Sequence, residues 1–275
     1  MPTDSDIAGH YARDGLEASI RDALRKSGLD PDHLAPADLS PVDEFHIGWR
    51  PATEALLANL GLAADMRVLD IGAGLGGPAR HVADASGCRV TGIDRTPDYV
   101  AVANTLSEWC GLADRVTIRQ GSALDLPFDH AAFDVVTMIH VGMNIADKAR
   151  LFTEMRRVVK TGGRVGIYDI MRVGAGDPAY PAPWAASAAT SFLDTPAAYM
   201  AGLVAAGFEI ESETDRTQLA QEMARRAREA VERDGLPPLG LHLVMGDERP
   251  KRIGNMMAAV ADGIIAPIEI IARAA

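Results

Sequence analysis

The chain has 275 residues, of which 48% are hydrophobic and 24% are charged, so it carries enough apolar material for a sizeable globular core. Its net charge of −11 argues against nucleic acid as a partner, because phosphate binding needs a basic surface. Two cysteines offer no metal-ligand spacing, so we expect no metal site and a reducing, cytoplasmic setting.

Residues 1–60 are predicted to form a helical N-terminal lid. Apolar residues spaced by four indicate a helix that begins near Leu16 and stops at Gly28. A second helix is expected over 50–60. Between the two helices, short turns are predicted at three prolines: Pro31, Pro36 and Pro41. We see no apolar run typical of a secretory signal or a membrane span, so we expect neither.

Strand and helix patterns alternate over residues 61–213, the expected core. The predicted strands are 67–71, 89–93, 115–119, 133–139 and 163–170, with a further strand entered at 208. The predicted helices are 78–86, 97–110, 147–158 and 195–206. Near-continuous apolar runs are typical of parallel strands covered on both faces, so this order predicts a doubly wound α/β sheet.

The pattern changes after the core. Residues 214–263 are predicted to form two helices around Pro237 and Pro238, and we interpret them as a helical cap insertion over the sheet edge. Residues 264–275 contain an apolar run that is expected to be the last strand of the core sheet.

The most informative stretch is the apolar run V-L-D-I followed by the turn G-A-G-L-G-G, over 68–77. Glycine has no Cβ, so this backbone can turn tightly and come close to a ligand. The next predicted strand ends beside Asp94, whose carboxylate can accept both hydroxyls of a ribose. Because the carboxyl ends of parallel strands meet at one edge of a sheet, the pattern predicts a nucleoside-binding crevice there.

The glycines alone leave the nucleoside undecided. Gly72, Gly74 and Gly77 satisfy G-x-G-x-x-G, so an NAD(P)-dependent oxidoreductase is an open alternative. Asp70 argues against it, because a carboxylate beside a pyrophosphate places like charges together. The same carboxylate suits a ligand with an ammonium group, and S-adenosylmethionine carries an ammonium group, a sulfonium and a ribose.

The stretch resembles motif I of the class I S-adenosylmethionine-dependent methyltransferases, D-x-G-x-G-x-G. Further strings resemble the small-molecule subgroup that includes sarcosine/dimethylglycine N-methyltransferase-like and ubiquinone-biosynthesis-type enzymes: F-H-I-G-W-R, L-G-G-P-A-R, M-N-I-A-D-K and P-A-P-W. The resemblance implies a Rossmann-like, mostly parallel seven-stranded sheet. It also implies methyl transfer from S-adenosyl-L-methionine to N, C or O of a small-molecule acceptor. A non-catalytic S-adenosylmethionine-binding protein is a further alternative. The sequence leaves open whether the protein forms a homodimer.

The resemblance assigns cofactor-binding roles by position. Asp70 is expected to hold the methionine amino group and Asp94 the ribose hydroxyls. Many relatives have an aspartate where this chain has Ser122, and a hydroxyl accepts more weakly than a carboxylate. The full predicted set is His46, Asp70, Gly72, Ala73, Gly74, Gly76, Asp94, Arg95, Ser122, Ala123, Leu124, Ile139, His140 and Asn144.

The acceptor side is less determined by the sequence. His140 and Tyr168 are the candidate catalytic residues, and His140 either orients the acceptor or acts as a general base. The predicted acceptor-binding residues are Trp49, Asp169, Trp184, Tyr199, His242 and Met245. An aromatic cage among them suits a methylated ammonium through cation–π attraction, and equally suits an apolar ring. Ordinary packing is the alternative for each.

Overall fold

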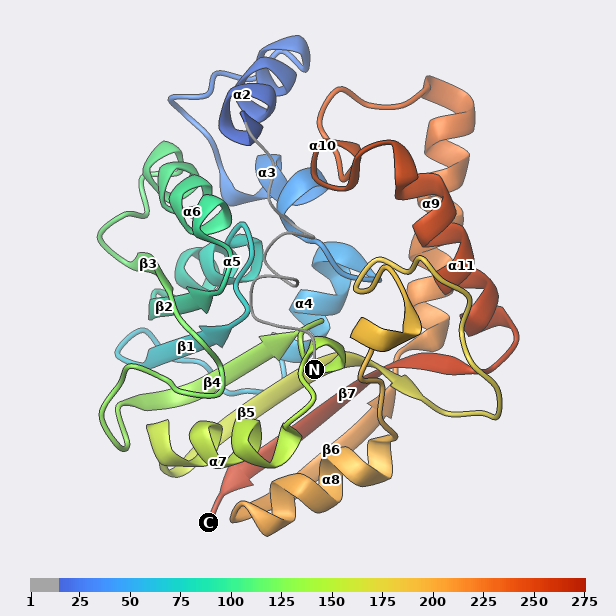
Figure 1. Cartoon of the computed structure of the whole chain (residues 1–275). Coiled ribbons are helices and arrows are strands. Elements are labelled where there is room, and N and C mark those ends of the chain that lie inside the picture. Colours follow the sequence, from blue (N-terminus) through green and yellow to red (C-terminus); the bar gives the residue numbers. More distant parts are fainter. Residues whose placement is uncertain (1–14) are drawn as a thin grey trace.

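A seven-stranded sheet runs through the middle of the molecule in the order β3-β2-β1-β4-β5-β7-β6 (Figure 1). It belongs to a computed structural model that describes residues 15–275. The strands are β1 Arg67–Ile71, β2 Arg89–Asp94, β3 Val116–Gln120, β4 Phe133–Ile139, β5 Val159–Arg172, β6 Phe208–Asp215 and β7 Ile265–Ala274. The first five strands pair in parallel and β7 pairs antiparallel to both neighbours, so the predicted doubly wound, mostly parallel sheet is confirmed.

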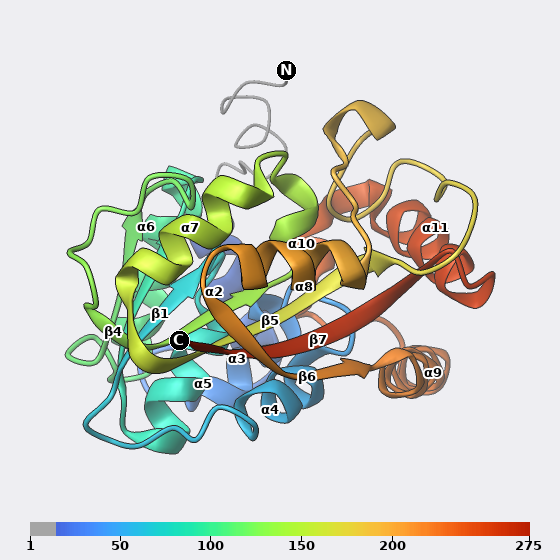
Figure 2. The same ribbon diagram turned by 90° about the horizontal axis from the view of Figure 1, so that it is seen from below.

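Helices cover both faces of this sheet, and Figure 2 shows α7 and α8 on one side and α4 and α5 on the other. Successive residues of a strand point to opposite faces, so Val135 packs in one buried cluster while Val136 packs in the other. The helices are α2 Leu16–Lys26, α3 Pro36–Asp43, α4 Trp49–Leu57, α5 Gly77–Ser86, α6 Pro97–Trp109, α7 Lys148–Val158, α8 Pro196–Ala205, α9 Thr217–Asp234, α10 His242–Met245 and α11 Arg249–Ala261.

A third apolar cluster joins α2 and the 214–263 segment to α6. Leu16, Ile20 and Leu24 of α2 share it with Leu239 and Val244 from the 214–263 segment. The lid and the cap insertion therefore pack together at this point. The first fourteen residues of the predicted lid lie outside the described residues, and the four-part division into domains stays a prediction.

Two segments of the chain differ from their predicted structure. The segment expected to form only short turns contains α3, because Pro36 stands in its first turn, where no backbone N–H is required. The Asp38 carboxylate also accepts a hydrogen bond from the Ala35 N–H at the start of that helix. The cap insertion holds α9, α10 and α11 rather than two helices. Over residues 15–275, no helix combines the length and the apolar character that crossing a membrane requires.

Candidate active site

A cavity opens at the carboxyl ends of β1, β2 and β4. The strand order reverses at this point of the sheet. From β1, strands β2 and β3 follow toward one edge, whereas β4 and β5 follow toward the other. Ligands of open α/β sheets bind at such a switch point. Most of the predicted cofactor residues line it: His46, Asp70, Gly72, Ala73, Gly74, Asp94, Arg95, Ala123, Ile139, His140 and Asn144.

The glycine turn after β1 is held by its own backbone against β2. The Gly72 and Ala73 N–H groups donate to the Ile93 carbonyl at 2.8 and 2.9 Å. Gly74 has φ +53, and a Cβ built there would meet nothing within 4 Å. Its backbone therefore faces open space, so a ligand can approach it closely.

Asp70 lies at the end of β1 and is only 2% exposed. Its Oδ1 accepts a hydrogen bond of 2.8 Å from the Thr137 hydroxyl of the neighbouring β4, whereas its buried Oδ2 has no partner among residues 15–275. Burial raises the pKa of Asp70 to about 7, and the Thr137 hydrogen bond opposes that rise. A buried carboxylate oxygen without a donor fits a ligand that brings a cation.

Asp94 ends β2 and fixes the glycine turn. Its Oδ2 accepts from the Gly74 N–H and its Oδ1 from the Thr96 N–H, both at 2.9 Å. Burial raises its pKa, while these backbone hydrogen bonds act in the opposite direction. Each carboxylate oxygen has a second lone pair, so Asp94 can still accept hydroxyl groups from a ligand.

Three predicted cofactor residues do not line the cavity. Gly76 precedes α5, where a Cβ would come within 2.9 Å of Arg80 Nη1. The Ser122 hydroxyl accepts from the Leu124 N–H at 3.2 Å and so stabilises its own turn. Leu124 packs against the buried cluster beneath α7 and α8.

Glu44 is a site residue that the sequence analysis missed. Its side chain is fully buried between α3 and α4, with Oε2 at 2.7 Å from both His46 Nε2 and the Thr53 hydroxyl. Arg50 Nε donates to Oε1 at 2.5 Å. Burial alone would raise its pKa, but the hydrogen bond and charge of His46, with Arg50, lower the pKa of Glu44 to about 2. Glu44 thus orients the His46 ring at the cavity wall.

A buried ion pair, which the sequence analysis also missed, connects the lid to the core. Arg80 of α5 donates from Nη2 to Asp43 Oδ2 at 2.7 Å, and both side chains are fully buried. The same guanidinium donates to the carbonyls of Leu75 and Ala103. Arg80 lies within the string L-G-G-P-A-R, but nothing local in the sequence indicates that its partner is 37 residues upstream.

His140 follows β4 with φ +60, a conformation that costs energy for a residue other than glycine. The next two N–H groups, of Val141 and Gly142, donate to the Asp169 carboxylate at 2.8 and 2.9 Å and hold this turn. The His140 Nε2 is buried without a partner in the described part of the chain. Burial and the nearby His46 lower the pKa of His140 to about 3, so its ring is neutral at physiological pH.

The structure does not assemble the predicted aromatic cage. Trp184 lines the cavity, but Tyr199 lies against Phe152 of α7, in the cluster on one face of the sheet. The Tyr199 hydroxyl donates to Asp169 at 3.1 Å. Trp49, Asp169, His242 and Met245 are likewise absent from the lining.

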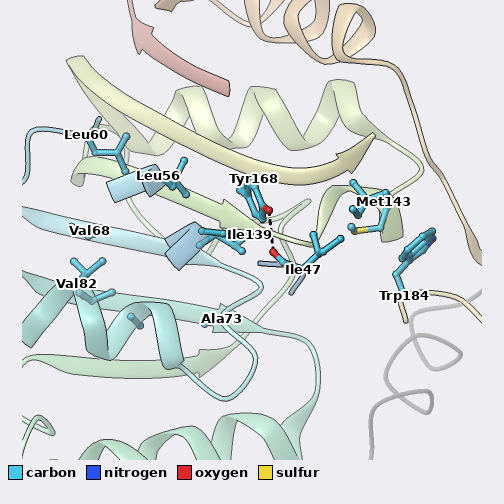
Figure 3. Close-up of a cluster of buried hydrophobic side chains, with 14 of the residues drawn as sticks. Ile47, Leu56, Leu60, Val68, Ala73, Val82, Ile139, Met143, Tyr168 and Trp184 are labelled. Carbon is cyan, nitrogen blue, oxygen red and sulfur yellow. Dashed lines mark hydrogen bonds between the residues drawn. The ribbon is translucent and has the colours of Figure 1, made fainter. Parts of the chain in front are cut away.

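Tyr168, a candidate catalytic residue, also lies outside the lining. Its hydroxyl donates to the Ile47 carbonyl at 3.0 Å, and Figure 3 shows this bond among buried side chains. Burial raises its pKa well above the usual range, so the hydroxyl stays protonated. Among residues 15–275, no group of three or more His, Cys, Asp or Glu side chains is arranged to hold a metal ion.

Comparison with known proteins agrees with this geometry. Residues 69–167 match the family described as methyltransferase domain. A 27-O-demethylrifamycin SV methyltransferase of Amycolatopsis mediterranei is 32% identical over 191 residues, which are 66% of this chain and 67% of that protein. A sterol 24-C-methyltransferase of Gibberella zeae is 36% identical over 114 residues, 42% of this chain. The chain spans only 30% of that second relative's length.

A solved geranyl diphosphate C-methyltransferase of Streptomyces coelicolor A3(2) has the same fold. It matches with a TM-score of 0.69 and 21% identity, covering 100% of this chain and 99% of that one. Together with the extent of the rifamycin-type match, the motif at 70–76 and the site built on it, these findings show that the chain belongs to the class I S-adenosylmethionine-dependent methyltransferases.

Proposed function

We propose that the protein transfers a methyl group from S-adenosylmethionine to a small-molecule acceptor. The observation that carries this proposal is the buried, unpartnered Oδ2 of Asp70, beside backbone at Gly74 that faces open space. An ammonium group would satisfy that oxygen. Membership of the family removes the NAD(P)-dependent alternative, and the cofactor, when bound, supplies a methyl group attached to a sulfonium.

Different residues of the cavity bind different parts of the cofactor. Asp70 binds the methionine amino group and Asp94 the ribose hydroxyls, while Ala123 and Ile139 contribute apolar walls. Such a reaction depends mainly on holding the acceptor in line and excluding water. The lid and the cap insertion pack together beside α6, and this contact supports the exclusion of water.

His140 orients the acceptor through its neutral ring, and Trp184 lines the same cavity. The contacts of Tyr168 and Asp169 support a different role from the one expected. Tyr168 bonds to the lid backbone at Ile47 and Asp169 bonds to the turn after His140, so both act as positioning residues.

The test is an acceptor library screened for release of S-adenosylhomocysteine. Wild-type protein is expected to turn over at least one small molecule, and Asp70→Asn is expected to lose most of that activity. Asp84→Asn, an exposed carboxylate on α5, is the matched control and should behave as wild type. Cofactor binding without turnover of any acceptor would support the non-catalytic alternative instead.

We also propose a cytoplasmic protein without a nucleic-acid partner. The net charge of −11 and the two free thiols, Cys88 and Cys110, support this setting. A homodimer is proposed as the assembly to test, and sedimentation equilibrium distinguishes it from a monomer.

A further inference from the structure

The cavity has two chemically different sides. On the β2 side lie Asp94, Arg95 and Thr96, the side proposed for the nucleoside. On the β4 side lie five residues that we call the acceptor end: His140, Val141, Ile145, Pro183 and Trp184. Four of these five residues have apolar or aromatic side chains, and Figure 3 shows Trp184 beside the buried side chain of Met143. The acceptor end is therefore mostly apolar.

The polar groups around the acceptor end are largely bonded to each other. Asn144 Nδ2 donates to the Trp184 carbonyl at 2.7 Å, and Trp184 Nε1 donates to the Ser191 hydroxyl at 2.9 Å. Lys148 Nζ donates to the carbonyls of Ile145 and Phe192 at 3.1 and 2.6 Å. Against this background, the buried His140 Nε2 stands out because it has no partner within residues 15–275.

None of the five acceptor-end residues carries a charged side chain at neutral pH. The charged groups next to them are already bonded: Lys148 to backbone carbonyls and Asp169 to the N–H groups of Val141 and Gly142. The guanidinium in the cavity lining belongs to Arg95, on the β2 side. The lining carboxylate of Asp43 is paired with Arg80, and His46 is paired with Glu44. A phosphate or ammonium buried beside Ile145 and Trp184 would therefore lose its hydration without meeting an oppositely charged side chain in the cavity lining at that end, which is costly.

Resting on the proposed methyl transfer, we propose that the acceptor is a neutral, mainly apolar molecule that donates one hydrogen bond, from a hydroxyl group, to Nε2 of His140. Burial keeps this ring neutral, with a pKa of about 3, and in the tautomer that carries its proton on Nδ1 the buried Nε2 is a hydrogen-bond acceptor. The Asp169 carboxylate fixes the following turn and thereby the direction of the ring.

The test measures binding to protein saturated with S-adenosylhomocysteine, so it does not depend on turnover. Calorimetry compares neutral alcohols with their phosphate esters, geraniol against geranyl diphosphate among them, and includes choline as a cationic probe. Neutral alcohols are expected to bind at least about tenfold more tightly than their esters and than choline. Equal or tighter binding of the charged probes, or no binding of any neutral probe, would overturn the proposal.

Two variants locate the hydrogen bond. His140→Gly suits the positive φ but removes the acceptor atom, and it should weaken geraniol binding about tenfold. His140→Asn keeps an acceptor and tolerates the same backbone, so it should retain most of the affinity. Equal affinities in both variants would overturn the role of Nε2. Absence of S-adenosylhomocysteine release from a neutral acceptor that binds would count against the proposed function instead.

Discussion

The two sides of the cavity are built in different ways. The β2 side and the neighbouring Asp70 of β1 form a compact unit, because Asp70, Gly74 and Asp94 fall within 25 residues. The Gly74 N–H donates to the Asp94 carboxylate, and the glycine turn after Asp70 donates to the β2 backbone at Ile93. The acceptor end combines the turn after β4 with the segment around Trp184, and the nearby lid residue His46 adds a third distant part of the sequence. A local motif can specify the first side, whereas tertiary packing specifies the second.

The largest effect is expected where the lid meets the glycine turn. Arg80→Met leaves the Asp43 carboxylate buried without its cation, and breaking such a pair costs about 3–5 kcal/mol of unfolding free energy. Urea unfolding measures this loss. Arg226→Met, an exposed arginine on α9, is the control and should change stability by less than about 0.5 kcal/mol. If Arg80→Met also changed stability by less than about 0.5 kcal/mol, the Asp43–Arg80 pair would not be what holds the lid on the core.

The next effect tests the β2 side alone. Asp94→Ala removes the proposed acceptor of the ribose hydroxyls and should weaken S-adenosylmethionine binding by about 1.5–3 kcal/mol, the scale of a hydrogen bond to a charged group. Asp98→Ala, an exposed carboxylate on α6, serves as the control in the same calorimetric titration. An affinity unchanged by Asp94→Ala would remove the ribose role.

A pH dependence follows from Asp70. Its pKa of about 7 means that the ligand-free carboxyl group is mostly protonated below pH 7, and an ammonium ligand must displace that proton. The ligand's α-amino group stays protonated below about pH 7.7, so the ligand does not titrate in this window. Cofactor affinity should therefore fall by up to about tenfold per unit as pH drops from 7 toward 5.

Calorimetry in buffers of different ionisation enthalpy detects the proton that is released. Asp70→Asn is the matched variant, and its affinity should be weaker but nearly independent of pH over this range. Wild-type affinity that stays constant from pH 7 to 5 would argue that the carboxylate does not meet the amino group.

The smallest effect is expected at the acceptor end. If His140 only orients the acceptor, His140→Asn should reduce kcat by less than about tenfold, because general base catalysis is worth ~10²–10⁴-fold. Its low pKa also predicts that His140 contributes no limb to the wild-type kcat profile between pH 5 and 9. A loss above about a hundredfold, or a limb near pH 6 that the variant lacks, would assign the base role to His140.

The same division explains what the sequence can predict. Asp70 and Asp94 end apolar strands on either side of a glycine turn, so their meeting follows from the parallel sheet itself. Glu44 and the Asp43–Arg80 pair depend on how the lid packs, and no local pattern encodes that contact. The position of Tyr199 also depends on tertiary packing, since its place on α8 puts it against Phe152, within the buried cluster.

The most direct test of the account is a crystal structure with S-adenosylhomocysteine bound. We predict its amino group within hydrogen-bonding distance of Asp70 Oδ2, its ribose hydroxyls on Asp94 and its sulfur directed toward the acceptor end at His140. An amino group placed away from Asp70, with Oδ2 still unpartnered, would contradict the central claim that the β2 side and Asp70 form the cofactor site.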